Sequence, residues 1–195
     1  MGANAAGPKT PIMKIFSFGT QDNQAYLYAP LDVSGRCNPD PPRSMAAGWV
    51  PPTFELVGRD EYRSYLPKTD FPTLGLGNAV LSARAVDRLR PILAPCGEIL
   101  PIHLSNDAEQ FYLFNVTRII NAVDMERSKF MPLPSGSLGP CELLVFDPSK
   151  LRDAMFFRTT QLGSLYEIYA SQAVADAVKK ARLTGFEFTQ VWELS

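Results

Sequence analysis

The sequence has few of the residues on which most catalytic and metal sites depend. It contains one histidine, His103, and three widely separated cysteines, Cys37, Cys96 and Cys141. No CxxC or HxxxH pair is present, so the ligand spacing of a compact zinc site is missing. We therefore expect no metal and no cofactor. The odd number of dispersed cysteines favours a reducing compartment.

An excess of charge of one sign and long apolar runs are also lacking. Lys and Arg total 19 against 20 Asp and Glu, which gives a formal net charge of −1. A nucleic-acid-binding protein would carry a basic stripe for phosphate contacts, so we expect no nucleic-acid partner. No run reaches the roughly 18 apolar residues of a membrane span, and the first residues do not resemble a secretory signal, so we expect no membrane association. Composition sets no oligomeric state.

What the sequence does contain is typical of a folded globular protein. Hydrophobic residues make up 46% of the 195 positions and charged residues 20%. We predict a disordered tail over residues 1–11 and a single domain over residues 12–195. Within this domain, residues 12–79 form an irregular, β-containing front part, and residues 80–195 form the more regular core. Five prolines between positions 32 and 52 predict an irregular loop there.

A β-hairpin is predicted near the middle of the chain. Residues 98–104 alternate, with Leu100, Ile102 and Leu104 on one face and His103 on the other. Ser105, Asn106 and Asp107 supply turn chemistry, and residues 111–116 form a return strand that is apolar on both faces. A strand of that kind belongs inside a sheet.

Two helices flank further strands. Ser82 is the expected N-cap of a helix that runs to about Arg90, where Pro91 limits further helical bonding. Residues 171–183 form the last helix, with Gly185 as its C-cap. A helical turn is expected over residues 60–65, a loop over 132–140 and a buried strand over 142–146. The predicted fold class is α+β, a mostly antiparallel sheet with a few helices packed on it.

His103 limits the possible nucleophilic chemistry, because any Cys–His pair must use it. The thiol would come from Cys96 or Cys141, and the pair could react only within hydrogen-bond reach. Strand alternation places His103 beside Ile99 and Pro101, which favours a structural role for the histidine. We therefore assign no catalytic residues and keep a thiol hydrolase as an alternative.

Candidate partner-binding residues fall in the loops. Trp49 stands among glycine and prolines, where it is either a plug over the core or a contact hot spot. Asp60, Glu61, Asp107 and Glu109 sit in polar turns, where they are either solvated or contact a partner. The other aromatic residues mostly occupy strand positions and are expected in the core.

An ordered succession of short phrases carries a family resemblance over residues 80–195. The phrases are Ser82-Ala-Arg-Ala-Val-Asp-Arg-Leu89, Gly97-Glu-Ile-Leu-Pro101, Tyr112 with Asn115-Val-Thr117, Asp124, the ELLVF run, Phe156-Phe-Arg158, Tyr169-Ala-Ser171, Leu183-Thr-Gly-Phe-Glu-Phe188 and Trp192. Together they resemble the immunity protein 11 family of bacterial polymorphic toxin systems.

This resemblance implies a non-enzymatic, cytoplasmic protein that binds and neutralises a cognate toxin encoded beside it. It brings no motif of binding residues, so our hypothesis places the contacts at Trp49, Asp60, Glu61, Asp107 and Glu109, on loops that a scaffold tolerates well. Two alternatives stay open, the thiol hydrolase and a peptide-binding scaffold of a secretion system.

Overall fold

The computed structural model describes residues 13–39, 41–62, 64–75, 77–134, 138–162 and 167–194, and the predicted tail over residues 1–11 lies outside this part. The strands are β1 (Met13–Thr20), β2 (Tyr26–Tyr28), β3 (Thr53–Val57), β4 (Ala79–Ser82), β5 (Gly97–Leu104), β6 (Phe111–Val116), β7 (Lys129–Pro132), β8 (Leu138–Leu143), β9 (Phe156–Phe157), β10 (Ile168–Ser171) and β11 (Phe186–Leu194). The helices are α1 (Leu31–Gly35), α2 (Ala83–Leu93) and α3 (Gln172–Ala181), with a short 3₁₀ turn at Pro148–Lys150.

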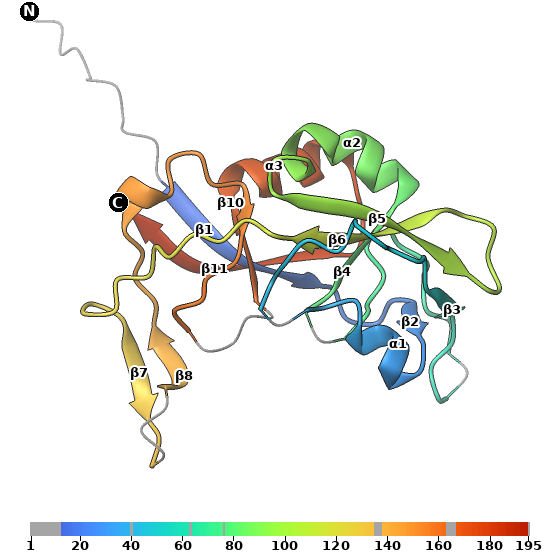
Figure 1. Ribbon diagram of the computed structural model, residues 1–195, viewed down its shortest axis with the longest axis horizontal. Helices are drawn as coiled ribbons and strands as arrows, with labels where there is room; N and C mark the ends of the chain where they lie inside the picture. Colours follow the sequence, from blue (N-terminus) through green and yellow to red (C-terminus); the bar gives the residue numbers. More distant parts are fainter. Residues whose placement is uncertain are drawn as a thin grey trace, which may run out of the picture.

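Two sheets form the body of the molecule, and a separate hairpin projects from it (Figure 1). One sheet has the order β2-β3-β5-β6-β4 and the other β11-β1-β10-β9, while β7 and β8 make the projecting hairpin. β3 pairs parallel to β5, and the other paired strands run antiparallel. Helices α2 and α3 contact each other along one side of the body. The predicted α+β class is confirmed.

The predicted central hairpin is present as β5 and β6. Leu100 lies opposite Leu113, and β6 is hydrogen-bonded on both sides, between β5 and β4. The prediction that this strand lies inside a sheet is confirmed. β4 was not predicted, because its four residues run directly into the N-cap of the next helix.

Helix α2 begins as predicted and ends later than predicted. The Ser82 hydroxyl accepts a hydrogen bond of 3.1 Å from the Ala85 amide. Pro91 lies inside the helix, which ends at Leu93 and not at Arg90. A proline so close to the last turn removes only one intrahelical bond, and the fully buried Leu93 side chain favours keeping that turn helical.

Helix α3 ends before the predicted cap. Its last residue is Ala181, and Arg182 adopts the left-handed conformation with φ of 53°. The Arg182 amide donates to the carbonyls of Lys179 and Val178, so Arg182 performs the capping role that was predicted for Gly185. Gly185, with φ of 88°, lies in the turn that leads into β11.

Two predictions in the front part are corrected. The predicted loop over residues 32–52 starts with helix α1, whose residues are at most half-buried. The predicted helical turn over residues 60–65 is instead a tight reversal of the chain: Arg59 bridges Tyr65 in antiparallel fashion, and the Asp60 amide donates to the Ser64 carbonyl.

The predicted loop over residues 132–140 overlaps the β7–β8 hairpin. Its side chains are largely exposed, so no apolar stripe marked the strands in the sequence. The ELLVF run is only partly buried, because Glu142 and Leu143 belong to this exposed hairpin while Leu144, Val145 and Phe146 enter the core.

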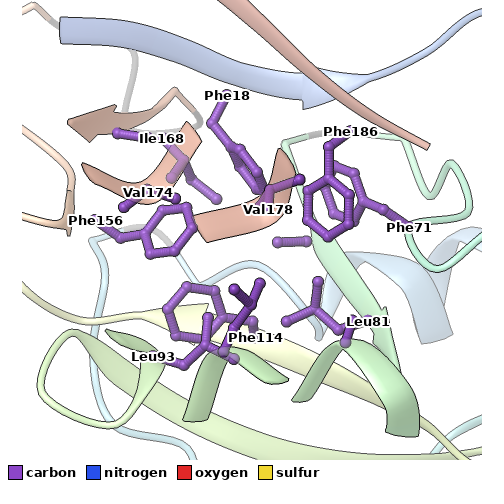
Figure 2. Close-up of a cluster of buried hydrophobic side chains, with 14 of the residues drawn as sticks. Phe18, Phe71, Leu81, Leu93, Phe114, Phe156, Ile168, Val174, Val178 and Phe186 are labelled. Atoms are coloured by element: carbon purple, nitrogen blue, oxygen red, sulfur yellow. The ribbon is translucent and has the colours of Figure 1, made fainter. Parts of the chain in front are cut away.

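A cluster of phenylalanines joins the two sheets (Figure 2). Phe18 of β1 lies with its ring centroid 4.8 Å from that of Phe71 and 5.0 Å from that of Phe156. Phe156 in turn meets Phe114 of β6 at 5.2 Å. Phe18 and Phe71 come from residues 12–79, and Phe114 and Phe156 come from residues 80–195. Both parts of the chain therefore share one core. We retain the proposal of a single domain.

Candidate partner-binding surface

Trp49 is a plug over a cluster of buried side chains that includes Phe54, Leu100 and Ile102, rather than a free side chain. Its ring is half-buried against that cluster, and Nε1 donates a hydrogen bond of 2.8 Å to the Pro101 carbonyl of β5. A buried indole normally satisfies its N–H in this way. These contacts support the packing role of Trp49, and its role as a contact hot spot stays a prediction.

Glu98 of β5 fastens the segment before Trp49 to the sheet. Its carboxylate accepts hydrogen bonds from the Ser44 hydroxyl, the Met45 amide and the Ala46 amide, and from the Asn115 side chain. Burial tends to raise the pKa of Glu98, but these four donors together outweigh it and lower the pKa below its ordinary value. A single ionised group thus holds an otherwise irregular, proline-rich segment.

Asp60 and Glu61 stand at the tip of the chain reversal that follows β3. The Asp60 carboxylate accepts a hydrogen bond of 2.7 Å from the Ser64 amide, which closes the turn. Glu61 is exposed. Asp60 therefore shapes the turn, and Glu61 is available to a partner.

Asp107 and Glu109 share one lysine. Lys68 Nζ lies 2.6 Å from a carboxylate oxygen of Asp107 and 2.7 Å from one of Glu109, and 5.6 Å from the centroid of the Phe111 ring. The hydrogen bond from Lys68 is the main cause of the lowered pKa of Asp107. The two acids thus form a cluster of net charge −1 with the lysine, rather than two independent solvated charges.

These acidic residues lie toward one end of the molecule. Two hydrogen bonds connect the turn after β5 to β3. The Asn106 side-chain amide accepts one from the Leu56 backbone amide and donates the other to the Leu56 carbonyl. Lys68 joins the same turn to the segment that follows Asp60 and Glu61. Trp49 is held elsewhere, against the middle of β5. The structure brings the four acids toward one edge and leaves the tryptophan apart.

Exposed tyrosines occupy the same end, and sequence reasoning missed them. The exposed fractions of Tyr62, Tyr65, Tyr28 and Tyr26 are 81%, 73%, 59% and 39%. Tyr26 and Tyr28 flank the buried Leu27 on β2, so they point away from the core. The expectation that strand aromatics lie in the core is wrong for these two residues. Their spacing two apart on one strand face was the available signal.

A second exposed apolar surface lies on the projecting hairpin. β7 and β8 contact mainly each other, and Met131, Leu133, Leu138 and Leu143 are all exposed there. In Figure 1 this hairpin and the strands β2 and β3 lie toward opposite ends of the molecule. A partner could therefore meet two separate apolar surfaces.

The buried acid Asp70 belongs to the scaffold. It accepts hydrogen bonds from the Ser82 hydroxyl at 2.8 Å, from Arg84 Nη1 at 2.7 Å and from the Thr184 amide at 2.9 Å. These bonds tie the start of α2 to the chain just after α3. The contacts of this carboxylate are therefore internal, and we place it outside the candidate surface.

The thiols and the histidine of the hydrolase alternative do not meet. Cys96 is buried directly before β5, and His103 is exposed near the other end of that strand, roughly 20 Å away at about 3.3 Å per residue. Cys141 lies on the β7–β8 hairpin. Burial and the carboxylates of Glu167 and Glu142 raise the pKa of Cys141, and a hydrogen bond from the Leu143 amide opposes them only in part. The raised pKa disfavours the reactive thiolate.

Within the described residues, no three His, Cys, Asp or Glu side chains lie together as metal ligands would. None of the helices in that part of the chain is both long and apolar enough to cross a membrane.

Comparison with protein-family models matches residues 30–193 to a family described as Immunity protein family (Imm11). The match starts at residue 30, well before Ser82, where the phrases that suggested this resemblance begin, so it includes the proline-rich segment, β3 and the tyrosine-bearing turn. No curated protein matches the chain.

Proposed function

The chain belongs to the immunity protein family Imm11, and we propose that it binds a cognate bacterial toxin and neutralises it without catalysing a reaction. The family match over most of the chain is the observation that carries this proposal. We further propose that the protein acts in the cytoplasm of the producing cell, and that the toxin is encoded beside it. The three cysteines are free thiols, which is compatible with a reducing compartment.

Support for a protein partner comes from the exposed tyrosines. Tyrosine offers a large, rigid contact area with a hydrogen-bonding tip, and it is enriched among residues that dominate binding energy. Tyr62 and Tyr65 are both exposed on one turn beside Asp60 and Glu61, so neither ring contributes to the core. We place the toxin contacts at this tyrosine-rich end, with Glu61 and the Asp107–Glu109 cluster as acidic neighbours that favour a basic partner surface.

Trp49 has a different role in this proposal. Because its indole is half-buried and hydrogen-bonded to Pro101, it supports the segment that carries the neighbouring exposed residues. A toxin would contact the exposed edge of the ring. An interface of the usual size, about 1,200–2,000 Å² in total, would span the tyrosine-rich end and reach this segment.

The first experiment tests neutralisation. The protein and the product of the adjacent toxin gene are expressed together in a susceptible host, and the purified pair is titrated by calorimetry. We expect survival and a stable complex with the wild-type protein. Failure to bind and to protect against the neighbouring toxin would overturn the proposal, as would turnover of a small substrate that depends on His103.

The contact residues are tested by charge reversal. Glu61→Lys should weaken toxin binding by about tenfold or more, since repulsion replaces attraction. Asp60 is left unchanged because its carboxylate closes the turn. The matched control is Glu126→Lys, an exposed acid just before the β7–β8 hairpin that gives the same change in net charge. Equal affinities of the two variants would remove Glu61 from the interface.

A further inference from the structure

A hollow opens in the proline-rich segment, and none of the exposed tyrosines is among its described lining residues. Its volume is about 360 Å³, within the range of small ligand sites, and its lining comes from α1, the chain after α1 and the residues around Trp49. Arg36 and Arg43 both line it. Apolar side chains complete the wall, among them Val33, Met45 and the ring of Trp49.

Long-range hydrogen bonds to β5 and β6 fix the chain segment that lines the hollow. Glu98 holds the amides of Met45 and Ala46, and Asn115 Nδ2 donates a hydrogen bond of 2.8 Å to the Arg43 carbonyl. Trp49 Nε1 is bonded to Pro101. A wall that is already ordered loses little conformational entropy when a ligand enters. The hollow is therefore preorganised although it has almost no regular secondary structure.

The two arginines in the lining give the hollow its basic chemistry. Arg36 uses Nε to donate to the Asp32 carbonyl at 2.9 Å, which leaves its two terminal nitrogens for another acceptor. None of the described residues that line the hollow is acidic. A guanidinium group matches a carboxylate in geometry and can bind it through two parallel hydrogen bonds.

From this arrangement we propose that the hollow receives an acidic side chain of the toxin, with its carboxylate between Arg36 and Arg43 and its aliphatic stem against Met45 and the ring of Trp49. The inference rests on the proposed function and adds the chemistry of one contact. A protein carboxylate fits better than a nucleic-acid phosphate, because apolar side chains line the hollow beside the arginines and the chain as a whole carries a net charge of −1.

The test neutralises both arginines and uses the toxin that binds the wild-type protein. Arg36→Gln with Arg43→Gln should weaken binding on the order of 100-fold, since losing the charged hydrogen bonds of each guanidinium group weakens binding about tenfold or more. The matched control is Arg88→Gln with Arg152→Gln, two exposed arginines outside the hollow with the same change in net charge. It should stay within about twofold of the wild type. Circular dichroism checks that both variants fold.

A double-mutant cycle identifies the acid. Neutralising the correct toxin residue should weaken wild-type binding and should have little further effect on the Arg36→Gln, Arg43→Gln variant. Trp49 supplies a second readout, because Trp192→Phe leaves it as the single tryptophan of the two in the chain. Its emission should change when the toxin binds.

The outcomes separate the two claims. If the wild type binds the toxin and the Arg36→Gln, Arg43→Gln variant binds as tightly as its control, this inference is overturned and the proposed function stands. If the wild type does not bind the toxin at all, both are overturned. A loss confined to the hollow variant, coupled to one acidic toxin residue, supports both.

Discussion

Glu98 illustrates how one residue can determine the path of a long segment. Its sequence context predicted only a strand, and β5 is present as predicted. The additional role, as acceptor for Ser44, Met45, Ala46 and Asn115, depends on contacts across as many as 54 residues. Strand periodicity contains no information about such distant donors.

At this scale we predict a pH-dependent stability effect of Glu98→Gln. The folded pKa of Glu98 lies below its unfolded value, so the ionised group stabilises the fold above the unfolded pKa, and this contribution is lost as pH falls through the folded pKa. The variant should lose about 1–2 kcal/mol of unfolding free energy near pH 7, and much less near pH 3.

Urea denaturation at both pH values measures the effect. Glu187→Gln, at an exposed position of β11, is the control and should change stability by less than about 0.5 kcal/mol at either pH. A loss for Glu98→Gln that is equally large at low pH would mean that the side chain acts through shape and not through charge.

At the scale of elements, burial explains which patterns could be read from the sequence. β5, β6 and α2 each place an apolar face against the core, so their periodicity is visible. The β7–β8 hairpin exposes most of its side chains, and its strands therefore looked like a loop. The end of α3 was misplaced for another reason, since the left-handed residue is an arginine and not the nearby glycine.

Arg182→Gly is predicted to stabilise the protein. A left-handed conformation costs a residue with a side chain roughly 1 kcal/mol relative to glycine, and the Arg182 backbone bonds to Lys179 and Val178 would be kept. We expect a gain in unfolding free energy of about 0.5–1 kcal/mol. Lys180→Gly, at a helical position two residues earlier, should instead destabilise by about 1 kcal/mol. Thermal denaturation of the two variants gives the comparison, and a loss of stability in both would contradict the predicted cost of the left-handed conformation at Arg182.

At the scale of the whole molecule, two exposed apolar surfaces lie toward opposite ends of the fold (Figure 1). Each surface contains several exposed tyrosine or aliphatic side chains, whereas single exposed apolar residues are common on protein surfaces. The tyrosine-rich end adjoins fixed acidic groups and the proline-rich segment, whereas the β7–β8 hairpin stands apart from the body. This difference is why the proposed toxin contacts are placed at the tyrosine-rich end.

We predict that Tyr62→Ala and Tyr65→Ala each weaken toxin binding by about tenfold or more. Because both side chains are exposed, the free energy of unfolding should change by less than about 0.5 kcal/mol. Met131→Ala and Leu138→Ala on the hairpin are the matched controls and should leave affinity within about twofold. Calorimetric titration decides between the surfaces, and the reverse pattern would transfer the interface to the hairpin.

The sequence by itself determined the α+β class, the central hairpin, the start of α2 and the family, because each depends on local periodicity, capping chemistry or an ordered set of short phrases. It also identified Asp60, Glu61, Asp107 and Glu109, whose part in binding stays a prediction. Only the tertiary structure decided that Lys68 joins two of those acids, that Trp49 packs on the core, and that Tyr62 and Tyr65 are exposed. The physical reason is that burial and charge pairing depend on segments far apart in the chain. Tyrosine in particular suits both a core and a surface, so its position along a strand does not settle its exposure.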